Sequence, residues 1–218
     1  MVEFFALGSF CILGGLHLAL ILWGSPRAQG ITKTLLLPLL AWYYIAAAEK
    51  FLVIVLLAVI FGWIGDVLLI KIQKEAFFKA GLASFLLGHL LYIPALFFFA
   101  GRAPGLVFVI GIIFAVPLGI LIQRCIKPSK ALRIPVIVYG IIIELMSLSA
   151  LQLMTARPEA WGILVFIGSL CFLISDFILG YFTFRTISKY GSFFIMFFYI
   201  LAQGGIIAGL ANLGPLSG

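Results

Sequence analysis

Charged side chains are scarce in this 218-residue chain, at 10% of all residues, and the acidic ones are the rarest, with 7 Asp and Glu against 14 Lys and Arg. Soluble domains carry about 25% charged residues. A chain that is 65% hydrophobic would have to expose apolar side chains over its whole surface in water, which excludes a soluble globular domain. The composition is typical of a protein whose solvent is the lipid bilayer.

The basic excess, a formal charge of +7 at pH 7, forms no patch or stripe. The Lys and Arg residues stand between apolar runs, whereas a nucleic-acid-binding surface gathers them on one face. The sequence therefore predicts membrane lipids and no nucleic acid as its partners.

Cysteine is also rare, and its placement excludes the sites that cysteine usually builds. Cys11, Cys125 and Cys171 lie far apart and show no metal-ligand spacing, so we interpret them as small apolar packing residues. The sequence contains no phosphate-binding loop and no clustered metal ligands. We therefore expect neither a metal nor another cofactor.

Long apolar runs make up most of what is present, and polar, proline or glycine punctuation separates them. Each approaches the roughly 20 residues that a membrane-spanning helix needs. The first run is not expected to be a signal peptide, because Met1-Val2-Glu3 has no basic residue. We predict an all-α polytopic membrane protein, a single domain over residues 1–218 with eight transmembrane helices at about 3–23, 34–48, 51–70, 77–99, 104–123, 134–154, 160–182 and 191–212.

The basic residues are unevenly divided between the two sets of loops. Eleven follow odd-numbered runs, and only Lys50, Arg102 and Arg157 lie on the other side. Cytoplasmic loops carry the excess of Lys and Arg, so we expect the odd-numbered loops in the cytoplasm and both termini outside. We expect a multi-pass protein of a bacterial inner membrane.

The two halves of the chain, about 1–102 and 103–218, resemble each other. Two of the three shared motifs contain a polar residue that is rare in this sequence. Helices one to four and five to eight then run in the same directions, so we predict a 4 + 4 parallel repeat about an axis along the membrane normal. The paired motifs are Lys33…Pro38 with Lys130…Pro135, Ile64…Leu69 with Ile174…Leu179, and Tyr92…Ala95 with Tyr199…Ala202.

Ionisable residues inside the apolar runs are the strongest functional candidates, because a charge in hydrocarbon is costly unless it faces protein or water. Asp66 and Asp176 occupy equivalent places in the two halves, near the basic loops. If they share one cavity, both carboxyls cannot ionise cheaply, so one keeps its proton. That combination supplies an acid and a base, as hydrolysis near neutral pH requires.

Several further polar residues fall at similar depth and are candidate substrate-binding groups. His89 has Tyr92 on its face, Tyr199 and Gln203 form a polar stripe four residues apart, and Tyr139 lies on the sixth run. Glu144 is a possible accessory acid, or a neutral group bonded to a neighbouring helix. Each also has a structural interpretation, since polar side chains hold membrane helices together.

The motifs occur in the order seen in the YhhN family of membrane proteins, which the chain resembles from about residue 31 to 205. Two positions depart from the family pattern: Thr34, where members often carry proline, and the acid at Glu144. The motifs that carry the resemblance are Lys33…Pro38, Trp63-Ile64-Gly65-Asp66-Val67-Leu68-Leu69, Phe85-Leu86-Leu87-Gly88-His89-Leu90-Leu91-Tyr92, Pro135…Tyr139…Met146, Ser175-Asp176…Leu179 and Tyr199…Gln203.

The resemblance implies a lysoplasmalogenase, which cleaves the vinyl ether bond of lysoplasmalogens into a fatty aldehyde and a glycerophospho head group. Protonation of the alkene needs a positioned general acid, and the resulting cation needs a carboxylate, which suits Asp66 and Asp176. An apolar cavity would hold the chain of the lysophospholipid. Lys33, Lys71 or Arg185 would meet its phosphate.

Two other classes of protein share some of these features. A transporter of small solutes or lipids also keeps buried carboxyls, repeats and proline-interrupted helices, here at Pro94 and Pro117. An intramembrane aspartyl protease uses two aspartates, and Pro94-Ala95-Leu96 resembles its Pro-Ala-Leu element, although the order of the motifs here is different. Release of aldehyde without any ion gradient would separate the hydrolase from the transporter.

Overall fold

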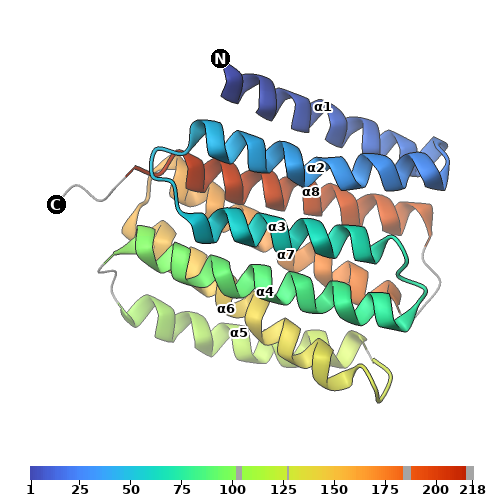
Figure 1. The fold of residues 1–218 in the computed structure, drawn as a ribbon. Helices are drawn as coiled ribbons and strands as arrows, with labels where there is room; N and C mark the ends of the chain where they lie inside the picture. Colours follow the sequence, from blue (N-terminus) through green and yellow to red (C-terminus); the bar gives the residue numbers. More distant parts are fainter. Residues whose placement is uncertain (102–104, 127, 184–187, 215–218) are drawn as a thin grey trace.

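The computed structural model describes residues 1–101, 105–126, 128–183 and 188–214, which fold into eight α-helices that alternate in direction (Figure 1). Because the number is even, α1 begins and α8 ends at the same end of the bundle. The helices are α1 (Val2–Trp23), α2 (Pro26–Ala47), α3 (Val53–Leu69), α4 (Glu75–Ala100), α5 (Gly105–Ile126), α6 (Arg133–Ala156), α7 (Ala160–Thr183) and α8 (Lys189–Ala211).

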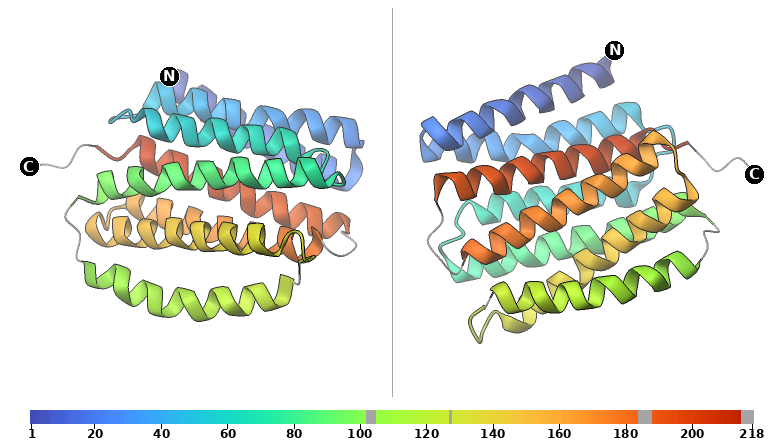
Figure 2. Two further views of the ribbon diagram at one scale, coloured as in Figure 1. Left: turned by 60° about the horizontal axis from the view of Figure 1, so that its bottom comes forward. Right: turned by 180° about the vertical axis from the view of Figure 1, so that it is seen from behind.

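The helices form a bundle in which α1 and α5 lie at opposite edges (Figure 2). The closest pairs are α7 with α8 and α3 with α4, while α4 also packs on α6 and α2 on α8. Helix α5 contacts only α6 and α7 among the described helices. Of the residues of α5 whose side chains are described, only Gly111 and Ile126 are buried. This helix is therefore the most loosely held part of the bundle.

Seven of these helices are long and apolar enough to cross a membrane. The exception is α3, whose 17 residues stand at the lower limit for a spanning helix. Large apolar side chains such as Ile12, Trp23 and Ile113 project outward. That surface suits hydrocarbon, since lipid tails and not water then surround it. The chain is a multi-pass membrane protein.

The predicted start of the second helix, at residue 34, is wrong, because α2 begins at Pro26. Ser25 caps the helix through a hydrogen bond from the Ala28 backbone N–H, at 3.3 Å, and proline at the first position suits a helix start. The polar residues that suggested a loop are used inside the structure. The hydroxyl of Thr32 pairs with His17 Nδ1 at 2.7 Å, which ties α2 to α1.

Rows of small residues on α4 and α8 form helix-packing faces. Ser84 donates a hydrogen bond to the Phe61 carbonyl at 2.6 Å, and a Cβ added at Gly88 would lie 3.1 Å from the Ala58 carbonyl oxygen. A Cβ at Gly209 would lie 2.7 Å from the Trp161 carbonyl oxygen. These close approaches bring α3 against α4 and α7 against α8.

Helix pairing follows the same order in both halves, with α2 on α3 and α3 on α4, then α6 on α7 and α7 on α8. This pattern is what a duplication would leave, and the 4 + 4 repeat stays a prediction. The edge helices differ, because α1 packs on α8 as well as on α2 whereas α5 packs on α6 and α7.

Membrane orientation can be tested with single cysteines placed at the two ends of the bundle. In a chain whose three natural cysteines are replaced by alanine, we expect Ser129→Cys to react with an impermeant thiol reagent only from the cytoplasm. Glu49→Cys should react only from outside, and both positions are exposed. The reason is the excess of basic residues in the odd-numbered loops. The opposite labelling pattern would invert the orientation. Lys127 and Gly218, which mark the same two ends in the sequence, lie outside the described residues.

Candidate active site

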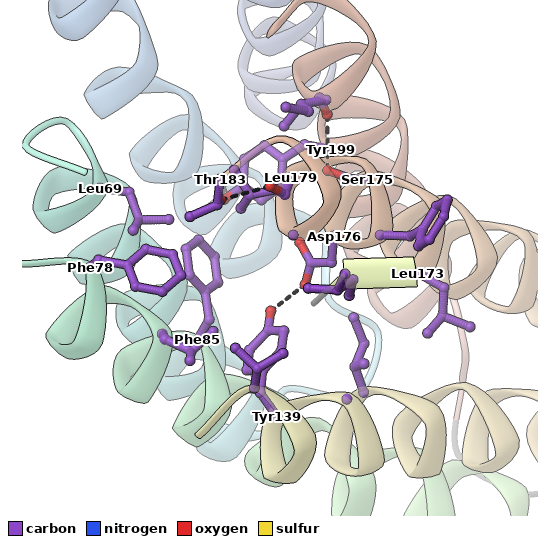
Figure 3. Close-up of a pocket in the computed structure, with 18 of the residues that line it drawn as sticks. Leu69, Phe78, Phe85, Tyr139, Leu173, Ser175, Asp176, Leu179, Thr183 and Tyr199 are labelled. Atoms are coloured by element: carbon purple, nitrogen blue, oxygen red, sulfur yellow. Dashed lines mark hydrogen bonds between the residues drawn. The ribbon is translucent and has the colours of Figure 1, made fainter. Parts of the chain in front are cut away.

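A cavity of about 140 Å³ lies inside the bundle, bounded by residues from α2 to α8 (Figure 3). Most of its lining is apolar, with Phe78, Leu82 and Phe85 from α4 and Ile195 and Met196 from α8. An apolar chain would therefore fit this wall without leaving a polar group unpaired. The polar part of the lining consists of Lys33, Asp66, Tyr139, Glu144, Ser175, Asp176, Thr183 and Tyr199.

Asp66 is held by two partners near the end of α3. Its side chain is 1% exposed, and Oδ1 lies 3.3 Å from Lys33 Nζ on α2. Tyr199 on α8 donates a hydrogen bond from its hydroxyl to Oδ2 at 2.6 Å. The glycine before it, Gly65, leaves room for the Phe85 ring, which would lie 2.6 Å from a Cβ at that position. Asp66 is thus a buried carboxylate paired with a lysine.

Asp176 lies on α7 and accepts a hydrogen bond at Oδ2 from the hydroxyl of Tyr139 on α6, as Figure 3 shows. The neighbouring Ser175 hydroxyl donates to the Ile195 carbonyl at 2.9 Å, so it fixes α7 to α8. This hydrogen bond explains Ser175 structurally. In the described part of the chain, no cation lies within ion-pair distance of Asp176.

The two aspartates thus meet the same cavity in unequal surroundings. Each accepts a hydrogen bond from a tyrosine on another helix, but only Asp66 has a lysine at 3.3 Å. One carboxyl with a cation and one without can differ in protonation at the same pH, which is what an acid and base pair requires.

Glu144 also reaches this cavity, from α6, and is partly exposed. Its carboxylate lies directly against Gly119 of α5, where an added Cβ would collide with it. None of the described residues forms an ion pair with Glu144. Glu144 therefore stands between the cavity and α5.

Three predicted binding residues lie away from the cavity lining: His89, Tyr92 and Gln203, all at most 2% exposed. The His89 ring packs edge-on against Phe172, with ring centres 4.6 Å apart, and against Tyr139 at 5.6 Å. His89 therefore supports the ring of Tyr139 from behind. The structure brings Lys33, Tyr139 and Tyr199 to the aspartates and keeps these three outside.

Of the three basic residues predicted to bind the phosphate of the substrate, the structure describes Lys33 and Lys71, and only Lys33 lines the cavity. Lys33 is engaged with Asp66, so its ammonium is turned toward the cavity. Lys71 is exposed beyond the end of α3, beside the Phe77 ring at 5.2 Å, and does not line the cavity. Arg185 lies outside the described residues.

An aromatic cluster behind the site was not predicted from the sequence. Phe172 on α7 meets the rings of Phe85, His89 and Tyr199, with centres between 4.6 and 6.3 Å apart. It fixes the ring of Tyr199, which carries the hydroxyl bonded to Asp66. A phenylalanine inside an apolar run gives no local signal of such a role, because most of the 22 phenylalanines of the chain face lipid or core.

Among the described residues, no group of three or more His, Cys, Asp or Glu side chains gathers as a metal would need. The three cysteines are free, and Cys11 is exposed on α1. The cavity itself presents carboxyls, a lysine and tyrosines as its titratable groups.

The model of the YhhN family matches residues 28–210 of the chain. No curated protein and no solved structure matches the sequence. The matched range begins two residues after the start of α2 and ends one residue before the end of α8, so it contains every residue that lines the cavity.

Proposed function

Because the chain belongs to the YhhN family, we propose that it is a membrane-embedded lysoplasmalogenase. The observation that carries this proposal is the pair of intramembrane aspartates, Asp66 and Asp176, on one mostly apolar cavity. The apolar wall suits the alkenyl chain, and the unequal carboxyls suit acid-catalysed addition of water. The proposed substrate is a lysophospholipid with a vinyl ether at its first glycerol carbon.

The proposed reaction adds one water molecule across the vinyl ether. A general acid protonates the outer alkene carbon, and the positive charge is shared between the inner carbon and the ether oxygen. Water then attacks the inner carbon and loses a proton to a carboxylate. The hemiacetal that forms gives its hydroxyl proton to the ionised carboxylate while its bond to the glycerol oxygen breaks. The glycerol oxygen takes the proton from the other carboxyl and leaves as the glycerophospho product. The other product is the fatty aldehyde.

We assign the general acid to Asp176 and the carboxylate to Asp66. The Lys33 ammonium at 3.3 Å favours the charged form of Asp66, while Asp176 has no such partner among the described residues. Tyr139, bonded to Asp176, would orient its proton toward the alkene. Asp66 would steady the developing cation and accept the proton from water.

The other two classes have weaker support. A small-solute transporter would use the same buried carboxyls to couple ions to a solute, but most of the lining is apolar and favours a hydrocarbon chain. A lipid transporter would share this lining and would release no aldehyde. For the protease, the resembling segment Pro94-Ala95-Leu96 does not contribute to the lining, so it lies apart from the aspartates. The hydrolase accounts for both the acids and the apolar wall.

The direct experiment is to incubate the purified protein in a neutral detergent with a lysoplasmalogen and to measure aldehyde release. Turnover without an ion gradient would support the hydrolase and exclude a function that is only transport. No aldehyde from folded, monodisperse protein over a range of lysoplasmalogen head groups would overturn the proposal.

Lys33 offers a further prediction, because it is the cation beside Asp66. We expect Lys33→Gln to lower kcat by about 10²-fold, as does the loss of one preorganised electrostatic partner in other enzymes. Lys33→Arg should restore most of the activity. The matched control is Lys79→Gln, which breaks the exposed pair of Lys79 with Glu75 and should leave kcat unchanged. Equal kcat in Lys33→Gln and the parent would contradict the role of this ion pair.

A further inference from the structure

A second and larger hollow lies between α5 and α6, with a volume of about 820 Å³. Its floor is apolar, with Ile112, Val116 and Ile120 from α5 and Leu145 and Leu148 from α6. It opens where α5, the most loosely held helix, meets its neighbour. We call it the α5–α6 groove.

Three cations line one end of the α5–α6 groove: Arg124, Lys130 and Arg133. Arg124 lies in the last turn of α5 and Arg133 begins α6, so Lys130 falls in the connection between them. All three side chains are exposed, and none forms an ion pair with a described acidic residue. The groove thus joins a free positive end to an apolar trough.

The α5–α6 groove shares a wall with the cavity of the aspartates. Gly140 and Glu144 of α6 line both spaces. Gly140 has no side chain to close the wall, and the Glu144 carboxylate reaches Gly119, which lines the groove on the α5 side. A molecule in the groove is therefore one helix face away from Tyr139 and Asp176.

We propose that the α5–α6 groove docks the lysophospholipid substrate, with Arg124, Lys130 and Arg133 binding its phosphate. In the docked state its single hydrocarbon chain lies in the trough. To react, the chain passes Gly140 and Glu144 and enters the cavity of the aspartates. This inference rests on the function proposed above, and it moves the head group from Lys33 to the other side of α6. Glu144, in the wall between the two spaces, is then a positioning residue for the substrate.

The chemistry of the groove favours a single-chain phospholipid over free phosphate or an uncharged lipid. Free phosphate would use only the three cations, and an uncharged lipid only the trough. Arginine suits phosphate because its planar fork donates two parallel hydrogen bonds. Tyr139 follows Arg133 by six residues, about 9 Å along α6. An extended glycerophosphate unit is shorter than this, and the long Arg133 side chain covers the difference.

Binding can be measured without turnover by using a radiolabelled saturated alkyl glycerophosphocholine, which has no alkene to protonate. We expect Arg124→Gln/Lys130→Gln/Arg133→Gln to weaken its binding in a neutral detergent at least about tenfold, because three charge-assisted contacts are lost. Binding of the corresponding alkylglycerol, which lacks the phosphate, should not change. The matched control is Lys71→Gln/Lys74→Gln, two basic residues in the α3–α4 connection that line neither space.

A bulky side chain provides an independent variant that keeps all the charges. Ala115 lines the α5–α6 groove, whereas Ile113 on the same helix is 63% exposed and lies outside it. We expect Ala115→Trp to weaken binding of both analogues at least about fivefold by filling the trough, and Ile113→Trp to bind like the parent. If the triple variant does not fold, comparing the two tryptophan variants still tests whether the lipid binds in the α5–α6 groove.

Several results would overturn the site. They are unchanged binding of the phosphate-bearing analogue to the folded triple variant, an equal loss in the Lys71/Lys74 control, and equal affinities of the two tryptophan variants. Because these measurements need no turnover, they are separate from the proposed hydrolase. Phosphate-dependent binding without aldehyde release would keep the docking site and contradict the enzyme, and the reverse result would contradict the docking site alone.

Discussion

Asp66→Asn and Asp176→Asn are each expected to reduce kcat on a lysoplasmalogen by about 10²–10⁴-fold, the range that one general acid or base contributes. Asparagine keeps the size of the side chain and can still accept the tyrosine hydrogen bonds. It can neither donate the proton that the alkene needs nor carry the charge that steadies the cation. The measurement is aldehyde release by purified protein of equal monodispersity.

The two variants should also differ in a way that reports their separate roles. Asp66→Asn removes the charge beside Lys33 and leaves a partly buried ammonium without its partner, so its thermal stability should fall more than that of Asp176→Asn. The control is Glu75→Gln, an exposed acid on α4. Near-parental turnover in either aspartate variant would rule out the carboxyl pair as the catalytic device.

The helices were predictable from the sequence because membrane-spanning segments are set by one dominant quantity, the length of an apolar run. Seven of the eight predicted segments lie within three residues of α1 or of α3 to α8 at each end. The start of α2 was not predictable in this way, because the Ser-Pro cap is followed by the polar residues Arg27 and Gln29. There, capping and the contacts of Thr32 outweigh local polarity.

The candidate site was predictable only in part. Asp66 and Asp176 stand out in the sequence because a charge inside an apolar run is costly in hydrocarbon. Lys33 stands out for the same reason, at the start of a long apolar run. The partners of each acid come from other helices, with Tyr199 lying 133 residues from Asp66 and Tyr139 37 residues from Asp176. One sequence cannot reveal such long-range pairs. His89 and Gln203 are buried in the bundle but do not line the cavity, which the sequence alone could not show.

The predicted repeat makes sense of the inequality between the two aspartates. In the paired motifs Lys33 corresponds to Lys130, and Asp66 to Asp176. Lys33 pairs with Asp66 inside the cavity, whereas Lys130 lines the end of the α5–α6 groove. In the proposed mechanism, this difference keeps Asp66 charged and leaves Asp176 able to carry a proton. In the proposed docking site, Lys130 binds the phosphate.

Substrate selectivity is the second large effect that follows from the proposed chemistry. Alkenyl lysophospholipids should be hydrolysed, while saturated alkyl and ordinary acyl lysolipids should show essentially no turnover. An alkyl ether has no alkene to protonate, and an acyl ester needs a nucleophile with donors for its oxyanion. Ser175, the serine nearest the acids, already donates its hydroxyl to the Ile195 carbonyl. Unreactive lysolipids should instead act as inhibitors, because they fill the same spaces.

The same mechanism predicts that proton transfer to carbon limits the rate. Turnover in deuterium oxide should therefore be severalfold slower under saturating substrate, with single-turnover measurements used to establish that chemistry is the slow step. A diacyl-like plasmalogen should be a poor substrate, since the α5–α6 groove and the cavity accommodate one chain. Comparable turnover of an acyl lysolipid would require a nucleophile that the described cavity does not offer, and the absence of a solvent isotope effect on the chemical step would exclude carbon protonation by Asp176.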